Sequence, residues 1–364
     1  VSSTMMASWI WGSSIGAAIT GIILSIKYKA PIITAWSAPG TALLVALFPH
    51  ISLNEVVAAY ITSAVIIFFI GITGSFDKLL KWIPHGVAAG MMAGILFQFG
   101  VGLFKATDSM PYVVFGMLAC FLLAKRFSPR YAIIWVLLSG IALSVLFGKI
   151  NPVPMNFSLA IPELIMPEWT WSSTLNLAIP LTIVSLTGQF LPGMAILKLS
   201  GYNTPAKPIL SVASIVSLAV AITGGITIVL AAITAALCTG KDSHELKEKR
   251  YIAGIANGIF YILGGLFAGS IVMLFSILPK ELVAALAGLA LLGAIATNIS
   301  VAMKDESQRD AALITFLATV SGMHFLGFSS VFWGICIGMI SHLVLSKREE
   351  KIITPPSTQN SAQS

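Results

Sequence analysis

Two short stretches of the chain, Pro31–Phe48 and Ile226–Thr239, carry the groups best suited to hold a ligand. In each stretch a run that favours extended backbone passes directly into a helical pattern of small residues. The N–H groups of the first helical turn have no partner inside their own helix, and the positive end of the helix dipole lies there too. Two such helix N-termini close together would favour an anion, each by about 0.3–1 kcal/mol when exposed and up to about 2 kcal/mol when buried.

The two helix starts differ in how their N–H groups could be capped. Ser37 can cap the first helix, and Pro39 suits its opening turn. The second helix begins Leu230-Ala231-Ala232, which offers no polar cap. Because buried donors are rarely left unpaired, we predict that a bound ligand supplies the acceptor there. Ordered water and the hydroxyl of Thr227 are the alternatives.

A third stretch, Leu186–Gly193, places a polar side chain in the middle of an apolar segment. Gly188, Pro192 and Gly193 open the helix around Gln189, so we predict that its amide faces a cavity and orients a ligand. A hydrogen bond to a neighbouring helix is the alternative role. Aromatic residues that could form a wall for a flat ligand by stacking are Trp36, Phe190, Phe260 and Tyr261.

The first two stretches are copies of one another. When Ile33–Leu44 is aligned with Ile226–Leu237, 193 positions later, six of the twelve residues are identical. A weaker echo follows at an offset of 195, where Ile83–Ala89 resembles Leu278–Ala284. The chain therefore consists of two homologous halves, each with one copy of the short helical stretch.

The composition is that of a membrane protein. Of the 364 residues, 57% are hydrophobic and only 10% are charged, and the mean hydropathy is +0.93, whereas soluble chains carry about a quarter charged residues. A net charge of +7 could suit nucleic acid, but the basic residues stand between apolar segments, where they set membrane topology. We therefore predict a multi-pass protein of the lipid bilayer without a nucleic-acid partner.

Thirteen apolar segments follow one another along the chain. The two copied stretches among them are too short to span, because a helix of roughly eleven residues reaches only about half of a 30 Å hydrocarbon core. Extended backbone at that depth is tolerated only inside protein or beside a cavity. The segments are Met5–Ser25, Pro31–Phe48, Val56–Gly74, Gly86–Phe104, Tyr112–Ala124, Ala132–Phe147, Leu175–Leu197, Ile209–Ile222, Ile226–Thr239, Ile252–Leu274, Leu282–Val301, Ala311–Met323 and Phe325–Leu345.

An odd number of segments leaves the two halves unequal. Two segments precede the copied stretch in the second half and one precedes it in the first, so we expect a missing first helix before Val1. Seven crossings per half make the halves run in opposite directions through the bilayer. The predicted fold class is an all-α polytopic membrane protein with a 7+7 inverted-repeat transporter fold and two elements that join a short strand to a half-helix.

The basic residues support this topology. If successive segments alternate sides, one side receives 18 of the 21 Lys and Arg residues, and the other receives only Lys105, Lys149 and Lys280. Basic residues accumulate on the cytoplasmic side of membrane proteins. We therefore expect the C-terminus in the cytoplasm. The segment Asn151–Ser173, with four prolines and two tryptophans, then lies on the extracellular surface.

Side chains suited to catalysis or metal binding are scarce. No Asp, Glu, Lys or Arg lies in the middle of a segment, although proton-driven transporters usually bury a carboxylate or a histidine. We interpret His85, His324 and His342 as structural, and the run Lys241–Glu245 as a solvated loop or a cytoplasmic gate. The three cysteines stand far apart in the sequence. We predict that the chain is not an enzyme and needs neither a cofactor nor a metal.

Four motifs resemble the benzoate:proton symporter (BenE-type) family. They are ITAWSAPGTALL at Ile33–Leu44, LTGQFLPGMAIL at Leu186–Leu197, AAITAALCTG with the following DSHE at Ala231–Glu245, and FLGFSSVFWGICIG at Phe325–Gly338. The similarity covers nearly the whole chain, from Ser8 to about Leu345. The motifs fall on the positions that the internal repeat selects.

The resemblance implies the fold of uracil and purine permeases, with substrate between the two copied stretches and beside the third. A core domain would comprise residues 1–74 and 174–276, and a gate domain residues 75–150 and 277–347, with an extracellular linker at 151–173 and a disordered cytoplasmic tail at 348–364. The implied substrate-binding residues are Ser37, Ala38, Pro39, Gly40, Thr41, Thr187, Gly188, Gln189, Phe190, Leu230, Ala231, Ala232 and Thr234.

The resemblance also implies import of benzoate or a related small aromatic carboxylate with a proton, by alternating access, across the bacterial inner membrane. The resemblance leaves open whether the protein forms a homodimer. Nucleobase permeases of this fold read ring N–H groups with glutamates, whereas the corresponding region here has Gln189 and no acid. That difference favours a ligand with its own negative charge. The alternatives are a nucleobase or inorganic-anion transporter of the same fold, and a passive channel.

Overall fold

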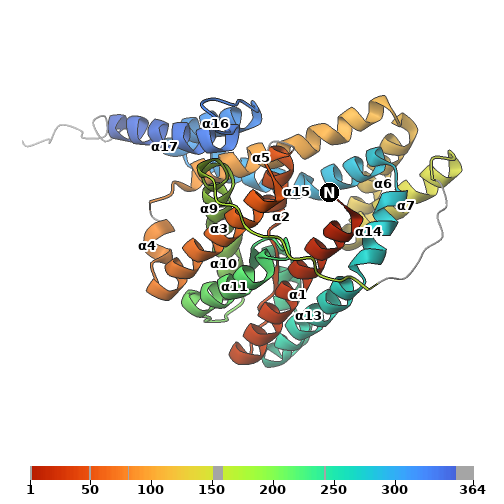
Figure 1. The fold of residues 1–364 in the computed structure, drawn as a ribbon, viewed down its shortest axis with the longest axis horizontal. Helices are drawn as coiled ribbons and strands as arrows, with labels where there is room; N and C mark the ends of the chain where they lie inside the picture. The colour runs from red at the N-terminus through yellow and green to blue at the C-terminus, as the bar shows by residue number, and fades with distance from the viewer. Residues whose placement is uncertain (1, 49–50, 81, 151–158, 242, 350–364) are drawn as a thin grey trace, which may run out of the picture.

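The computed structural model describes residues 2–48, 51–80, 82–150, 159–241 and 243–349. These residues form helices joined by short connections, together with two strands of three residues each (Figure 1). The tail predicted to be disordered, 348–364, lies outside the described residues from residue 350 onward, as do Asp242 and the start of the linker at 151–158. Residues 348 and 349 belong to α17, so for these two the prediction of disorder is wrong.

The elements follow the expected order. The first half contains α1 (Ser3–Tyr28), β1 (Thr34–Trp36), α2 (Ala38–Leu47), α3 (Leu53–Thr73), α4 (Phe76–Leu80), α5 (His85–Lys105), η1 (Ala106–Asp108), α6 (Pro111–Phe127), η2 (Pro129–Tyr131) and α7 (Ala132–Leu146). The second half contains α8 (Trp171–Ser173), η3 (Thr174–Ala178), α9 (Ile179–Ser185), η4 (Leu186–Phe190), α10 (Leu191–Leu199), α11 (Ala206–Ala221), β2 (Ile228–Leu230), α12 (Ala232–Thr239), η5 (Lys247–Lys249), α13 (Tyr251–Leu266), α14 (Ala268–Ile277), α15 (Lys280–Lys304), α16 (Glu306–Val320) and α17 (Ser330–Glu349).

Each of the thirteen predicted segments has a helical counterpart, with one correction. Among the described residues, six helices are long and apolar enough to cross a membrane alone, or seven if a bent pair counts as one. The bent pair is the segment predicted as continuous at Ile252–Leu274, which breaks into α13 and α14 with a bend of 68°. Gly264 and Gly265 directly precede the break, and glycine weakens a helix at such a position.

The two copied stretches meet in a short antiparallel ladder at the centre of the molecule. Its pairs are Thr34 with Leu230, Ala35 with Val229 and Trp36 with Ile228. The pairing extends by one bond at each end, because Ser37 N–H donates to Thr227 O (3.0 Å) and Ala231 N–H donates to Ile33 O (2.9 Å). The shift of 193 positions converts the pair Thr34 and Leu230 into the pair Thr227 and Ser37, so the ladder obeys the two-fold symmetry of the repeat.

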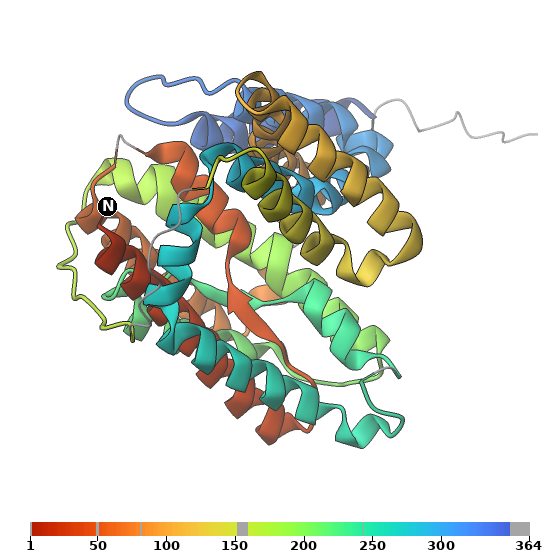
Figure 2. The same cartoon turned by 90° about the vertical axis from the view of Figure 1, so that its right-hand side faces the viewer.

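The helices pack into two bundles. The first bundle consists of α1–α3 and α8–α14, and α1 packs on α11, α13 and α14 while α3 packs on α11. The second bundle consists of α5–α7 and α15–α17, in which α5 packs on α15 and α16. Figure 2 shows α6, α7, α16 and α17, in gold and blue, above α1 and α13, in dark red and teal. The division of these helices into a core and a gate domain, and their relative movement, stay predictions.

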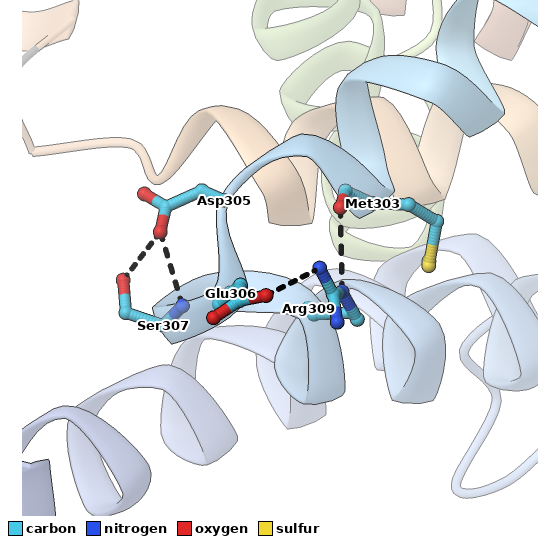
Figure 3. A network of polar contacts seen from close by, with 5 residues as sticks. All are labelled: Met303, Asp305, Glu306, Ser307 and Arg309. Atoms are coloured by element: carbon cyan, nitrogen blue, oxygen red, sulfur yellow. Dashed lines mark hydrogen bonds and ion pairs between the residues drawn. The ribbon is translucent and has the colours of Figure 1, made fainter.

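The turn between α15 and α16 is held by a polar network (Figure 3). Asp305 caps α16, because its Oδ1 accepts bonds from Ser307 N–H (3.0 Å) and the Ser307 hydroxyl (2.7 Å). These bonds lower the pKa of the Asp305 carboxyl. Arg309 donates to Met303 O (3.3 Å) and lies 3.4 Å from a Glu306 oxygen. The network fixes the angle at which α16 turns back against α5.

We expect that replacing Gly193 by alanine destabilises the protein. An added Cβ at Gly193 would lie 2.5 Å from Leu230 Cβ, so β2 would have to shift. Overpacking of this kind costs about 1–3 kcal/mol. Gly264→Ala is the matched control, since a Cβ there meets no atom within 4 Å. Thermal unfolding of the purified proteins should show a lower Tm for Gly193→Ala alone, and equal Tm values would contradict the close contact.

Candidate functional site

A cavity of about 790 Å³ lies between the two bundles. On one side it is lined by residues of β1, α2, η4, β2 and α12, and on the other by residues of α5, α6, α7 and α15. The described residues that line it include no Asp or Glu, and His85 and Lys125 are the basic side chains among them. The cavity therefore suits an apolar molecule that carries a negative charge.

Nine of the thirteen residues expected to bind substrate line this cavity. They come from all three stretches that the sequence singles out: Ala38, Pro39, Thr187, Gly188, Gln189, Leu230, Ala231, Ala232 and Thr234. Trp36, expected as an aromatic wall, lines the cavity as well, and its ring packs edge-on against Tyr261 with the ring centroids 5.4 Å apart.

The other four expected residues lie outside the cavity lining. Phe190 is fully buried in the core of the first bundle, so the expectation that it forms a wall is wrong. Its position follows from the helix turn, which directs Gln189 toward the cavity and the next side chain away from it. Gly40 packs against Leu181, and the Thr41 hydroxyl donates to Ser37 O (3.1 Å). Phe260 is 73% exposed on α13, away from the cavity.

Ser37, the fourth of these residues, lies directly behind the lining. Its Oγ accepts a bond from Gly40 N–H (3.1 Å) and thereby caps α2, while its O–H donates to Gln189 Oε1 (2.8 Å). The amide of Gln189 is therefore fixed by its oxygen, and its NH₂ group remains available as a donor. Gln189 thus bonds to a neighbouring segment and also lines the cavity, and its predicted role in orienting a ligand stays a prediction.

Gln189 owes its orientation to an irregular turn. Leu186–Phe190 forms a π-helical turn, η4, between α9 and α10. Such turns insert one residue into a helix and are frequent at functional sites. The sequence indicates a helix opened by glycine and proline at this place but does not specify a π-turn.

The N-terminus of α12 is uncapped. Its N-cap residue is Ala231, and no side chain accepts a bond from the first turn. The hydroxyl of Thr227 is buried without a hydrogen-bond partner, so it does not supply the cap. Ala231 and Ser37 lie four residues apart along the ladder, which corresponds to a distance of about 13 Å along the strands. The two helix N-termini thus lie at the two ends of the ladder, and the one at α12 has no side-chain cap.

Arg250 fixes the opposite end of α12. Its guanidinium donates to Thr239 O (2.7 Å), the last residue of the helix, to His244 O (2.8 Å) and to Glu245 O (3.3 Å). A positive charge at this end complements the helix dipole. The loop expected as a solvated run or gate is therefore tied to the half-helix. Among the described residues, no group of three metal-ligating side chains forms.

Asn176 joins the two bundles beyond the far end of the cavity. This residue of η3 accepts a bond from Ser329 N–H (2.6 Å) and donates to Gly327 O (3.1 Å) in the turn between α16 and α17. Glu55 and His324 lie beside it around a small hollow of about 90 Å³. The contact ties η3 of the first bundle to the α16–α17 turn of the second.

The cavity-lining residues of the second bundle were not identified from the sequence. They include Met92 on α5, Phe121 on α6 and Thr297 and Asn298 on α15. The echo between Ile83–Ala89 and Leu278–Ala284 was the available signal, because it marks the starts of α5 and α15, which pack together. His85, interpreted as structural, also lines the cavity.

The fold and the cavity define a membrane transporter with inverted repeats. The structure is similar to that of SLC26A9 (TM-score 0.61, 13% identity), where it covers 95% of this chain and 65% of that one. It is also similar to the transmembrane domain of the cyanobacterial bicarbonate transporter BicA (TM-score 0.56, 15% identity; 94% of this chain, 93% of that one). The expected fold relation to uracil and purine permeases is not supported by these comparisons.

The chain belongs to the benzoate membrane transport protein (BenE) family, whose model matches residues 1–344. It is 73% identical over 347 residues to the benzoate membrane transport protein of Acinetobacter baylyi, covering 95% of this chain and 88% of that one. It is 35% identical over 344 residues to the inner membrane protein YdcO of Escherichia coli, covering 94% and 88%. The protein is thus a multi-pass membrane transport protein and not an enzyme.

We expect Arg250→Gln to loosen the C-terminal end of α12. Each bond from a charged donor contributes about 1.5–3 kcal/mol, and each 1.4 kcal/mol changes an opening equilibrium about tenfold. Hydrogen–deuterium exchange of peptides from this loop should accelerate at least about tenfold. Lys249→Gln, which removes a neighbouring exposed charge, should leave the exchange rates unchanged. Equal rates in both variants would show that Arg250 does not hold the helix end.

Proposed function

We propose that this chain imports benzoate or a related aromatic carboxylate, together with a proton, across the bacterial inner membrane by alternating access. The observation that carries the proposal is the uncapped N-terminus of α12, which opens into a cavity whose described lining has no acidic side chain. The family and the relative at 73% identity support the choice of benzoate.

The carboxylate would bind at the first turn of α12. The backbone N–H groups there lack a cap, and the hydroxyl of Thr234 and the NH₂ group of Gln189 belong to the same cavity. These are neutral donors aided by the helix dipole, which suits a monovalent anion. Because the α2 N-terminus is already capped by Ser37, a single carboxylate would use the α12 end rather than bridge both helices.

The aromatic ring would lie against apolar side chains. Trp36 from β1 and Leu191 from α10 line the cavity on the side of the first bundle, and Met92 and Leu289 line it on the other. A ring between the bundles would contact both, so its binding would depend on how closely they approach. This arrangement links substrate binding to the relative position of core and gate.

A nucleobase fits this cavity less well. Reading the N–H groups of a base requires acceptors, and the oxygen of Gln189 already accepts a bond from Ser37. Burying that base would leave its donors unpaired, which costs about 1–3 kcal/mol for each group. An anion needs donors instead, and donors are what the α12 end offers.

The open end of the cavity would face the cytoplasm. His85, Lys125 and Pro129 lie at that end, on the side that holds most of the basic residues. At the other side the Asn176 bonds to the α16–α17 turn close the gap. The structure would then represent an inward-open state with a cytoplasmic C-terminus.

Transport by purified protein in liposomes tests this function. When the outside is more acidic than the inside, labelled benzoate should accumulate faster than in protein-free liposomes, which take up the neutral acid by diffusion, and a protonophore should abolish the accumulation. Unlabelled benzoate should compete, whereas uracil and sulfate should not. Accumulation that ignores the pH gradient would exclude proton coupling, and competition by uracil or sulfate would favour the corresponding alternative substrate.

Substitution of Gln189 by glutamate tests the anion site. The change keeps the shape but places a carboxyl beside the substrate carboxylate, and two like charges 4 Å apart repel by about 4 kcal/mol at an effective dielectric constant of about 20. Because protonation of the new carboxyl relieves part of this energy, we expect uptake to fall at least about tenfold. Unchanged uptake would remove Gln189 from the site.

The repeat supplies a matched pair of threonines. Thr234 lines the cavity, whereas Thr41, its equivalent 193 positions earlier, does not. Thr234→Val should raise the KM for benzoate several-fold because it removes one donor of about 0.5–1.5 kcal/mol. Thr41→Val should leave the KM near the wild-type value. Equal effects on both would contradict a carboxylate site at α12 alone.

A further inference from the structure

The cavity is larger than its proposed substrate requires. Cavities of about 300–1,000 Å³ suit drug-sized ligands, and at about 790 Å³ this one has room for more than one single-ring acid. The α12 N-terminus occupies its inner part, beside the ladder. The part near the last turns of α6 and the start of α5 contains Phe121, Lys125 and His85 and has no role in the site proposed above.

These three side chains bring a small exposed part of an aromatic ring and basic groups to the cavity lining. Lys125 Nζ lies 5.7 Å from the centroid of the Phe121 ring. Phe121 is 7% exposed and packs in the core of the second bundle, so the ring is a fixed platform. Lys125 and His85 are exposed toward solvent. The exposed part of the Phe121 ring and the ammonium group thus border the same space.

The start of α5 is held in place next to this space. Gly86 N–H donates to Gln308 Oε1 (3.1 Å), and Gln308 Nε2 donates to Asp305 Oδ2 (2.9 Å). His85 therefore extends from a helix start that is anchored to the α15–α16 turn shown in Figure 3. The imidazole of His85 lines the same cavity as Lys125.

We propose that Phe121, Lys125 and His85 form a second binding site for aromatic carboxylates, at the mouth of the cavity. The ring of the ligand lies in the cavity against the small exposed part of Phe121, and its carboxylate faces Lys125 and His85. The inference rests on the proposed function, since it assigns the same class of substrate to a second position. A molecule that leaves the α12 end occupies this site before it enters bulk solvent.

The physical properties of the two sites differ. At the mouth the carboxylate pairs with a solvent-exposed cation, so binding there is weak and decreases as salt screens the charges. At the α12 end the donors are neutral backbone and side-chain groups inside the protein, so salt affects that site less. Salt therefore separates the two sites in one measurement.

Equilibrium binding of labelled benzoate to the purified full chain tests the inference. Wild-type protein at low ionic strength should bind two molecules per chain, one of them lost on addition of salt. Lys125→Gln should weaken the salt-sensitive site at least about fivefold, a change consistent with loss of one screened charge pair. Lys125→Arg, which keeps the charge, should retain it.

Arg126→Gln is the matched control. Arg126 is the next residue on α6 and equally exposed, but it lies over the Phe127 ring and does not line the cavity. It should keep both sites. A wild-type stoichiometry of one, an unaltered second site in Lys125→Gln, or equal losses in Lys125→Gln and Arg126→Gln would overturn the inference while leaving the proposed function intact. Absence of any benzoate binding by wild-type protein would overturn both.

Discussion

The architecture depends on the backbone pairing of β1 with β2. Each copied stretch has to begin its helix inside the protein, so that the N-terminus of the helix is exposed there. The extended residues before that helix then need hydrogen-bond partners for their N–H and C=O groups. Neither copy can supply these partners alone. The antiparallel ladder satisfies both at once, because the bonds from Ser37 to Thr227 and from Ala231 to Ile33 close its two ends. The pocket at the helix ends therefore requires both halves of the chain.

The two-fold symmetry of the ladder does not extend to the helix ends. Ser37 stands where the second repeat has Leu230, and its hydroxyl both caps α2 and fixes the amide of Gln189. At the equivalent end of β2, Ala231 provides no cap for α12. One substitution in a duplicated element thus separates a capped helix end from an uncapped one. Under the proposed function, this difference is what would give a symmetric pair of helices a single anion position.

The helices, strands and internal repeat can be predicted from the sequence more completely than the side chains that line the cavity. The repeat, the apolar segments and the interrupted helices are visible because each obeys a local rule of length or periodicity. The residues of the second bundle that line the cavity, such as Met92 and Thr297, lie on ordinary helices, and only the packing of α5 on α15 brings them there. Phe190 shows the same limit, since the π-turn η4 decides which neighbour of Gln189 is buried. The bend between α13 and α14 also depends on packing, because two glycines permit a break without requiring one.

The distribution of charged side chains around the cavity follows from the same arrangement of helices and strands. An ion in the inner part of the cavity would have to leave water for a low-dielectric region, and an acidic side chain there would repel an anionic ligand. The described lining avoids both problems: the inner part uses uncharged donors, and the charged Lys125 stays where it remains exposed. Under the proposed function, a neutral but donor-rich inner part would bind an anion without holding it by a full opposite charge, so the free energy needed for release would stay small. The change from neutral donors to an exposed cation would then guide the anion outward from the ladder, whereas a buried lysine at α12 would trap it.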